Sequence, residues 1–181
     1  MPPGYIKNYG TRSDSNMKQI YLIRHAKSSW SQPDLSDYDR PLNKRGKKNG
    51  PVMAERFLAR GIIPQLIVSS PAVRARKTAR YMAKGTGLNK KDIVYDRGLY
   101  FSGFSYFLEI IEKLLKDIDI LFIVGHNPTV TDLAEYLTGE YFSNVPTCGV
   151  VGIEYRDRKG FETISGAGSL LLFDFPKKEF P

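Results

Sequence analysis

Short, mostly apolar runs recur along the chain and predict strands. The runs lie at residues 20–23, 65–70, 93–95 and 119–124. A run with little polar alternation is typical of a strand in a parallel sheet, where helices cover both faces. We therefore expect four such strands before residue 125.

Between these runs, apolar residues recur at the spacing of amphipathic helices. The first helix is expected from Lys44 to Ala59, with Asn43 as its N-cap and Gly61 as the residue that stops it. Pro51 lies inside this segment and is expected to kink the helix or to mark its true start.

Three more helices are expected, one after each of the later strands. Pro71 suits the first turn of the second helix. Ser102 or Ser105 is the expected cap of the third helix, and Asn127 is the expected cap of the fourth.

The pattern changes in the last quarter of the chain. Residues 148–155 and 169–175 predict two further strands, separated by a turn-prone segment at 157–160. We expect at least one of them to pair antiparallel at the edge of the sheet. The alternation of strands and helices before them predicts right-handed crossovers. The expected fold class is therefore α/β, a three-layer α/β/α sandwich with a mostly parallel central sheet and an antiparallel edge strand.

The domain organisation is expected to be simple. Residues 1–16 are rich in Gly, Asn, Ser and Pro and lack periodicity, so they predict a flexible N-terminal arm, to which we assign no role. Residues 17–181 predict a single domain, because no internal repeat or linker divides them.

Composition limits the class of protein. The apolar fraction of 41% and the charged fraction of 25% are ordinary for a globular protein. A single cysteine, Cys148, excludes an internal disulfide framework and a cysteine-based metal cluster. No apolar run approaches the length of a membrane span, and the N-terminus lacks the apolar core of a signal peptide. We expect a cytoplasmic protein that has no membrane partner.

The formal net charge of +8 allows nucleic acid, an anionic membrane or a phosphorylated substrate as a partner. The positive charge concentrates at residues 44–60 and 74–84, where it is mixed with apolar residues at helical spacing. Solvated helix faces explain most of these residues better than a binding surface does. Arg24 and Arg74 are exceptions, because each lies next to the end of a predicted strand.

Candidate chemistry gathers at the ends of the predicted strands. The chain has two histidines, His25 and His126, and each follows a buried strand closely. Arg24 precedes the first, and Arg74 lies four residues after Ser70, where it faces the same edge if the second strand lies beside the first. Two guanidinium forks, two imidazoles and the N-terminus of the helix after residue 127 suit one phosphate. The alternative is structural: a histidine that is merely a buried polar residue, with Arg24 paired to Asp39.

Three motifs resemble those of the histidine phosphatase superfamily, the clan of the cofactor-dependent phosphoglycerate mutases. They are Arg24-His-Ala26 after an apolar strand, the segment 69–79 that contains Arg74, and Val124-Gly-His-Asn127. The finer pattern, including Asp39-Arg-Pro-Leu42, is similar to that of the short SixA-like phosphohistidine phosphatases. The resemblance covers about residues 18–175 and implies a phosphoglycerate mutase-like fold.

The resemblance also implies a mechanism. His25 would take the phosphoryl group, and water would then hydrolyse the phosphohistidine, while Arg24, Arg74 and His126 hold the transferring group. Arg24, Arg74, Ser28 and Asn127 are the expected substrate-binding residues. No metal and no cofactor are expected. His25 must be neutral to attack, so activity should fall as pH drops through its pKa.

One departure from the superfamily narrows the substrate. Many metabolic members carry a glutamate shortly after the third strand as general acid and base, but residues 96–102 contain none. Cleavage of a P–N bond to imidazole depends less on a strong general acid than cleavage of an ester does, because the imidazole leaving group is readily protonated. This favours a phosphohistidine substrate. Asp39, Asp96 and Tyr100 are weaker candidates for proton handling.

Three hypotheses follow. The chain is a phosphatase of phosphohistidine in a protein of the histidine phosphotransfer type, a phosphatase of small phosphate esters, or a catalytically idle module that binds phosphorylated or nucleic-acid partners. The intact set of four core groups favours the first two, and we do not expect a nucleic-acid partner.

Overall fold

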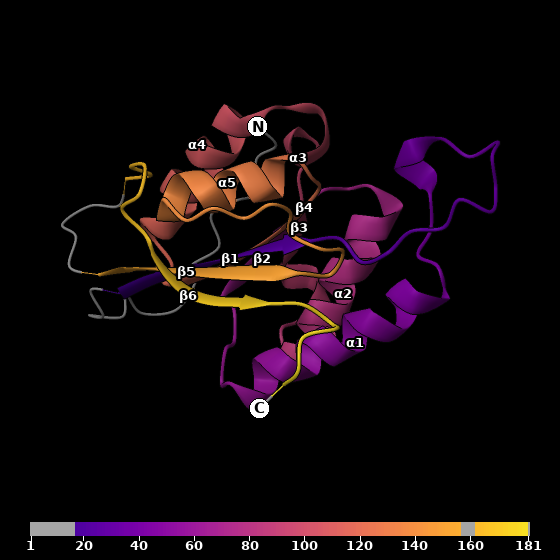
Figure 1. Ribbon diagram of the computed structural model, residues 1–181, viewed down its shortest axis with the longest axis horizontal. Helices are drawn as coiled ribbons and strands as arrows, with labels where there is room; N and C mark the ends of the chain where they lie inside the picture. Colours follow the sequence, from indigo (N-terminus) through magenta and orange to yellow (C-terminus); the bar gives the residue numbers. More distant parts are fainter. Residues whose placement is uncertain (1–16, 157–161, 181) are drawn as a thin grey trace.

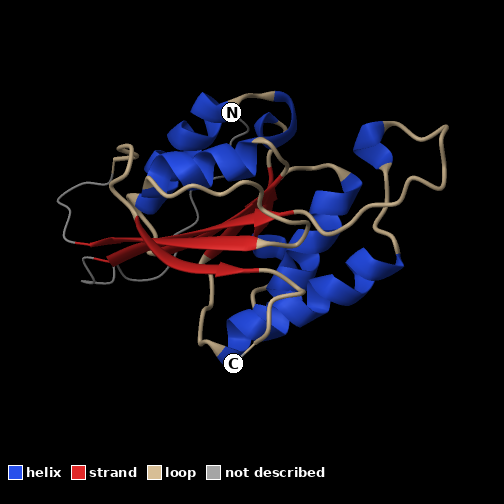
Figure 2. Ribbon diagram, viewed as in Figure 1, coloured by secondary structure: helices blue, strands red, loops and turns tan. Residues whose placement is uncertain are grey.

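The structure is a computed structural model that describes residues 17–156 and 162–180. Its centre is a six-stranded mixed sheet with the strand order β3-β2-β4-β1-β5-β6. The strands are β1 (Met17–Arg24), β2 (Leu66–Ser69), β3 (Ile93–Tyr95), β4 (Ile120–Gly125), β5 (Val150–Arg156) and β6 (Ser169–Asp174). Helices cover both faces, which gives the expected α/β/α sandwich (Figure 1, Figure 2).

The parallel part of the sheet matches the four predicted strands. The pairs β1–β4, β2–β4 and β2–β3 are parallel, whereas β5 pairs antiparallel with β1 and β6 pairs antiparallel with β5. The antiparallel edge was thus correctly predicted, and it comprises two strands.

Each face of the sheet has its own hydrophobic core. Ile20 and Leu22 of β1 pack into the core beneath α3 (Gly98–Phe101), α4 (Phe104–Leu115) and α5 (Thr129–Thr138). Tyr21 and Ile23 point the other way, into the core beneath α1 (Lys44–Ala59) and α2 (Val73–Thr86). All four side chains are fully buried, which explains why β1 has no polar alternation.

The strand order bears on the condition that was set for Arg74. Arg74 was expected to face the shared edge if β2 lay beside β1, but β4 lies between them and pairs with both. The length of the intervening chain does not fix which parallel strands become neighbours, so local pattern could not reveal this order. The central place of β4 brings the residue after it between the ends of β1 and β2.

The helix boundaries confirm some caps and correct others. Asn43 caps α1 by accepting a hydrogen bond from the Gly46 amide at 2.9 Å, and Gly61 follows the helix with φ of 68°. Pro51 lies within α1 and does not start it. Pro71 lies before α2 and not in its first turn, because that helix begins at Val73.

Two capping predictions were wrong. Neither Ser102 nor Ser105 caps α4, whose N-cap is Gly103. Asn127 does not cap α5, whose N-cap is Pro128. The Asn127 side chain instead donates to Thr131 and to the segment at Asn144 and Val145, and these tertiary partners compete with the local cap.

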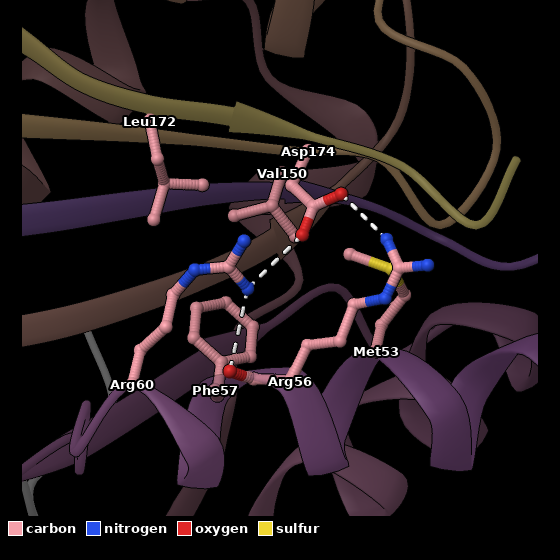
Figure 3. A pocket seen from close by; sticks show the side chains of 7 residues that line it. All are labelled: Met53, Arg56, Phe57, Arg60, Val150, Leu172 and Asp174. Atoms are coloured by element: carbon pink, nitrogen blue, oxygen red, sulfur yellow. Dashed lines mark hydrogen bonds and ion pairs between the residues drawn. The ribbon is translucent and has the colours of Figure 1, made fainter. Parts of the chain in front are cut away.

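The segment after β6 is tied to α1. Arg56 and Arg60 of α1 both pair with the buried carboxylate of Asp174, at 2.7 and 3.1 Å (Figure 3). Arg56 also donates to the carbonyl oxygen of Lys178 at 2.9 Å, and the Phe180 ring lies against both guanidinium groups. The edge of the sheet is therefore fastened to the helical layer.

Two predicted features, the arm at residues 1–16 and the turn at 157–160, lie outside the described residues. Within the described ranges, no helix combines the length and the apolar character that crossing a membrane would require.

Candidate active site

The carboxyl ends of β1, β2 and β4 meet at one edge of the sheet. The His25 amide donates to Gly125 O at 3.0 Å, and the Ser70 amide donates to Val124 O at 2.9 Å. The parallel ladder thus continues one residue past each strand. It places the residues that follow β1 and β2 on either side of His126, at the edge where open α/β sheets bind ligands.

His25 is a buried histidine whose proton position is fixed by its partners. Its Nδ1 lies 2.8 Å from Ala26 O, and its Nε2 accepts a hydrogen bond from Arg74 Nε at 3.2 Å. A carbonyl oxygen accepts hydrogen bonds, so Nδ1 carries the proton and Nε2 keeps its lone pair. Nε2 is therefore the nitrogen able to act as a nucleophile.

His126 lies beside it. The two imidazole rings are 5.0 Å apart between centroids, with 55° between their planes. His126 Nε2 lies 2.8 Å from the hydroxyl of the fully buried Ser70, whereas His126 Nδ1 is buried and has no hydrogen-bond partner.

Burial keeps both rings neutral at neutral pH. Desolvation, with further contributions from Arg74 and Arg24, lowers the pKa of His25 to about 4, against the opposing effect of its hydrogen bond to Ala26. Desolvation, together with His25 and Arg74, lowers the pKa of His126 to about 3. A phosphate anion would oppose these shifts, because an opposite charge favours the protonated ring.

Arg24 reaches the site from the last position of β1. Its Nη1 donates to Val145 O at 2.7 Å and to Asn144 Oδ1 at 3.1 Å, not to Asp39, so the predicted alternative pairing is absent. Its Nε is buried and has no hydrogen-bond partner. Desolvation lowers its pKa from the ordinary value, and a partner anion would offset that cost.

Arg74 projects from the first turn of α2. Besides His25, its guanidinium group contacts Asp37 of the short 3-10 helix η1 (Asp37–Asp39) and lies over the Tyr100 ring, 6.0 Å from the ring centroid. Its Nη2 donates to Asp37 Oδ2 at 2.7 Å, and its Nη1 donates to the Asp37 carbonyl oxygen. Arg74 is 4% exposed, so its guanidinium group makes these contacts with little access to solvent.

A second arginine and a tyrosine complete the surroundings of Asp37. Arg40 donates to Asp37 Oδ1 through Nε at 3.0 Å and Nη2 at 2.6 Å. The Tyr100 hydroxyl donates to Asp37 Oδ2 at 2.9 Å, and the Tyr100 ring lies 5.4 Å from the His126 ring. Desolvation alone would raise the pKa of Asp37, but the hydrogen bonds from Arg40, Tyr100 and Arg74 hold it well below its usual range.

Two buried nitrogens of this region are suited to bind an anion. Arg24 Nε and His126 Nδ1 are buried nitrogens without partners, and buried polar groups in proteins are nearly always paired. Arg24, Arg74 and the buried Arg40 bring three positive charges, against the single carboxylate of Asp37. The arrangement is suited to an anion next to His25 Nε2.

The structure brings together the four predicted core residues, His25, Arg24, Arg74 and His126. The other two predicted substrate-binding residues have protein partners. The Ser28 hydroxyl accepts a hydrogen bond from Arg40 at 2.8 Å, and Asn127 uses its amide nitrogen on Asn144 and Thr131. Contact of Ser28 and Asn127 with substrate remains a prediction.

The proton-handling candidates separate in space. Asp39 accepts a hydrogen bond from Ser36, and Asp96 accepts hydrogen bonds from Tyr106 and the Gly98 amide. Tyr100 alone of the three lies at the site.

Sequence reasoning missed Asp37, Arg40 and Ser70 as site residues. The signal for Asp37 and Arg40 was their separation of three residues in the segment after the first strand. The signal for Ser70 was its place at the end of the second. Among residues 17–156 and 162–180, no group of three or more His, Cys, Asp or Glu side chains is arranged to hold a metal ion.

Comparisons with known proteins agree with this geometry. The family model described as histidine phosphatase superfamily (branch 1) matches residues 20–100. An uncharacterized chloroplastic protein of Arabidopsis thaliana is 33% identical over 135 residues, which is 70% of this chain and 62% of that protein. The match thus spans less than two thirds of that relative.

Solved structures share the fold. A candidate phosphohistidine phosphatase SixA from Agrobacterium tumefaciens is 30% identical with a TM-score of 0.75, covering 88% of this chain and 98% of that one. The protein histidine phosphatase SixA complexed with tungstate is 19% identical with a TM-score of 0.74, covering 87% of this chain and 97% of that one. The second likeness concerns the fold alone.

Proposed function

The chain belongs to the histidine phosphatase superfamily, and from this premise we propose that it is a phosphatase that removes the phosphoryl group from phosphohistidine in a protein, through an intermediate on His25. Family membership supports the phosphatase activity. The choice of substrate and the steps below are our proposal.

One observation carries the proposal: His25 presents an unprotonated Nε2 to a set of positive groups. The ring is oriented by the hydrogen bond that its Nδ1–H donates to Ala26 O. The Arg74 Nε–H lies at the opposite nitrogen, Nε2, and an anion would bind on that side of the ring. An unprotonated nitrogen whose lone pair is held only by a hydrogen bond from Arg74, next to further guanidinium donors, is suited to the transfer of a phosphoryl group.

In the first step, the His25 Nε2 lone pair forms a bond to phosphorus while the P–N bond of the substrate breaks. The electron pair of that bond stays with the substrate imidazole, which leaves as a neutral ring after taking a proton from solvent. Arg24 and Arg74 offset the charge on the phosphoryl oxygens, and His126 offers a further hydrogen-bond donor. In the second step, a water oxygen bonds to phosphorus, the P–Nε2 bond breaks, and the proton of the water passes to solvent.

Acid–base properties favour a P–N over a P–O substrate. An alkoxide leaving group needs a proton donor, but Asp37 is held as an anion by Arg40 and Arg74. Desolvation and the neighbouring Asp37 raise the pKa of Tyr100, which makes it a poor acid. A leaving imidazole is protonated easily, so these surroundings handicap esters more than phosphohistidine.

The alternative within the same fold is a phosphatase of small phosphate esters. The position of Tyr100 favours it, because its ring lies 5.4 Å from the His126 ring and brings a hydroxyl group, although a weak acid, to the site. The catalytically idle module is disfavoured because its four core groups are intact and brought together.

We propose that turnover needs no metal ion, because the guanidinium groups of Arg24 and Arg74 occupy the role that a cation would otherwise take. Dialysis against a chelator is expected to leave the rate within about twofold of that of untreated protein. A rate restored only by an added divalent ion would contradict this part of the proposal.

The decisive experiment compares phosphohistidine proteins with a panel of phosphate esters under the same conditions. We expect faster phosphate release from phosphohistidine. His25→Ala is expected to lower turnover by about 10³-fold or more, since it removes the nucleophile. Asp34→Asn, an exposed change on the segment after β1, serves as the control and should retain full activity.

Two results would oppose the proposal. Preferential turnover of esters would support the alternative substrate class. Substantial activity in a folded His25→Ala protein, or the absence of labelled phosphoenzyme in wild type during turnover, would exclude the intermediate on His25.

A further inference from the structure

The segment between β1 and α1 forms a closed loop that projects beyond the edge of the sheet (Figure 1). Its two ends are joined where Ser29 donates its amide to Pro41 O at 2.8 Å and Asn43 donates its amide to Lys27 O at 3.0 Å. Arg40 adds a hydrogen bond to Ser28. The loop therefore has a fixed base, from which η1 carries Asp37 over the site.

Asp37 binds a particular edge of the Arg74 guanidinium group. A guanidinium presents one pair of N–H groups at its end, on Nη1 and Nη2, and another pair along its side, on Nε and Nη2. The backbone and side-chain oxygens of Asp37 take the end pair, while Nε points to His25 Nε2. The side pair is therefore the edge that faces a phosphoryl group on His25.

Asp37 is itself held in place. Arg40, whose side chain is 9% exposed, grips one carboxylate oxygen with two donors, and the Tyr100 hydroxyl donates to the other. Asp37 remains half exposed, so without these partners its side chain would be free to rotate. The chain of contacts runs from Arg40 through Asp37 to Arg74 and ends at His25.

We propose that Asp37 is a positioning residue, which holds the end of the Arg74 guanidinium so that its side edge faces the phosphoryl group carried by His25. This inference rests on the proposed function for its turnover arm only. Asp37 does not touch the reacting atoms. It acts through Arg74, and its geometry as a double acceptor matters more than its charge.

The test is a double-mutant cycle between Asp37 and Arg74, with two readouts. The first is the affinity for tungstate, a tetrahedral oxyanion, measured by calorimetry. The second is turnover, resolved into kcat and KM. Asp37→Ala is expected to weaken tungstate binding and to lower kcat/KM, each by about 10-fold or more. In the Arg74→Ala background, Asp37→Ala should change either quantity by less than about twofold.

A conservative variant separates geometry from charge. Asp37→Asn keeps an acceptor oxygen for Arg74 and Tyr100 but turns its amide group toward the two donors of Arg40, so its losses of affinity and of kcat/KM should be measurable and smaller than those of Asp37→Ala. Asp34→Ala removes one negative charge from the same loop at an exposed position and should leave both quantities unchanged. Thermal melting checks that each variant is folded, and Asp37→Asn carries the test if Asp37→Ala does not fold.

Tighter tungstate binding by Asp37→Ala would overturn the proposal, because it would mean that Asp37 competes with the ligand for Arg74. An undiminished effect of Asp37→Ala in the Arg74→Ala background would also overturn it. The binding readout needs no substrate. Absence of coupling in tungstate binding would therefore count against the role of Asp37 alone. A wrong substrate assignment would appear only in the turnover of the wild-type protein.

Discussion

At the scale of single residues, the notable feature is a pair of histidines that the fold keeps uncharged. Each histidine follows a strand and is surrounded by arginines, so its protonation would add a buried positive charge beside others. The sequence predicted both histidines as site residues, because a single residue separates each from the end of an apolar run. It did not predict Asp37, since nothing in the local sequence of a polar loop indicates which distant residue a polar side chain will contact.

The depressed pKa values predict how stability depends on pH. In the unfolded chain a histidine titrates near pH 6.5, so below that value the unfolded state binds protons that the native state does not. Stability is therefore expected to fall as pH drops from about 6.5 toward 4. The effect of His25 alone is on the order of 2 kcal/mol at pH 5.

Thermal or urea unfolding of wild type and His25→Gln between pH 7.5 and pH 5 measures this effect. Glutamine does not titrate, so the variant should lose less stability over that interval than wild type. Parallel stability curves for the two proteins would show that His25 is not kept neutral by the fold.

At the scale of elements, the first turn of α1 is packed directly against the backbone that follows His25. A Cβ atom built at Gly46 would lie 2.2 Å from Lys27 O, far inside contact distance. The Asn43 cap and the helix limits were readable from sequence because both are local. The close approach to Lys27 was not, because it depends on how the helix docks.

Gly46→Ala is accordingly expected to destabilise the protein by about 2 kcal/mol, although alanine is the better helix former. The clash is with backbone, which must shift and carry the residues next to His25 with it, so kcat/KM should fall as well. Urea unfolding and turnover of Gly46→Ala provide the measurement. Lys47→Ala, at an exposed site in the same turn, is the matched control. Equal stability of the two variants would refute the close packing.

At the scale of the whole molecule, one sheet separates two hydrophobic cores, and its strands do not follow one another in sequence order. The fold class followed from the alternation of apolar runs and amphipathic stretches. The position of β4 between β1 and β2 did not, because parallel pairing is decided by packing over long separations. The attachment of the C-terminal segment to α1 also escaped prediction, since Asp174 and its arginines are far apart in sequence.

This attachment predicts a large effect of Asp174→Ala. The substitution leaves Arg56 and Arg60 close together without the buried carboxylate that pairs with both (Figure 3). Unfolding free energy is expected to fall by about 2 kcal/mol, less than for a fully buried pair, because Arg56 keeps its carbonyl partners and the Arg60 side chain is 30% exposed. Glu55→Ala, an exposed acidic position on the same helix, should change stability by less than about 0.5 kcal/mol. Similar denaturation midpoints for the two variants would argue against the role of Asp174.

The place of β1 in the sheet has a consequence for biosynthesis. Its two neighbours are β4 and β5, so a ribosome that has delivered the first 119 residues has made an apolar strand whose hydrogen-bonding partners do not yet exist. Until more than a hundred further residues emerge, this apolar segment is unpaired in the nascent chain and is prone to aggregate. Translation products that end before β5 therefore carry His25 but not the sheet around it, and we expect them to aggregate or to be degraded.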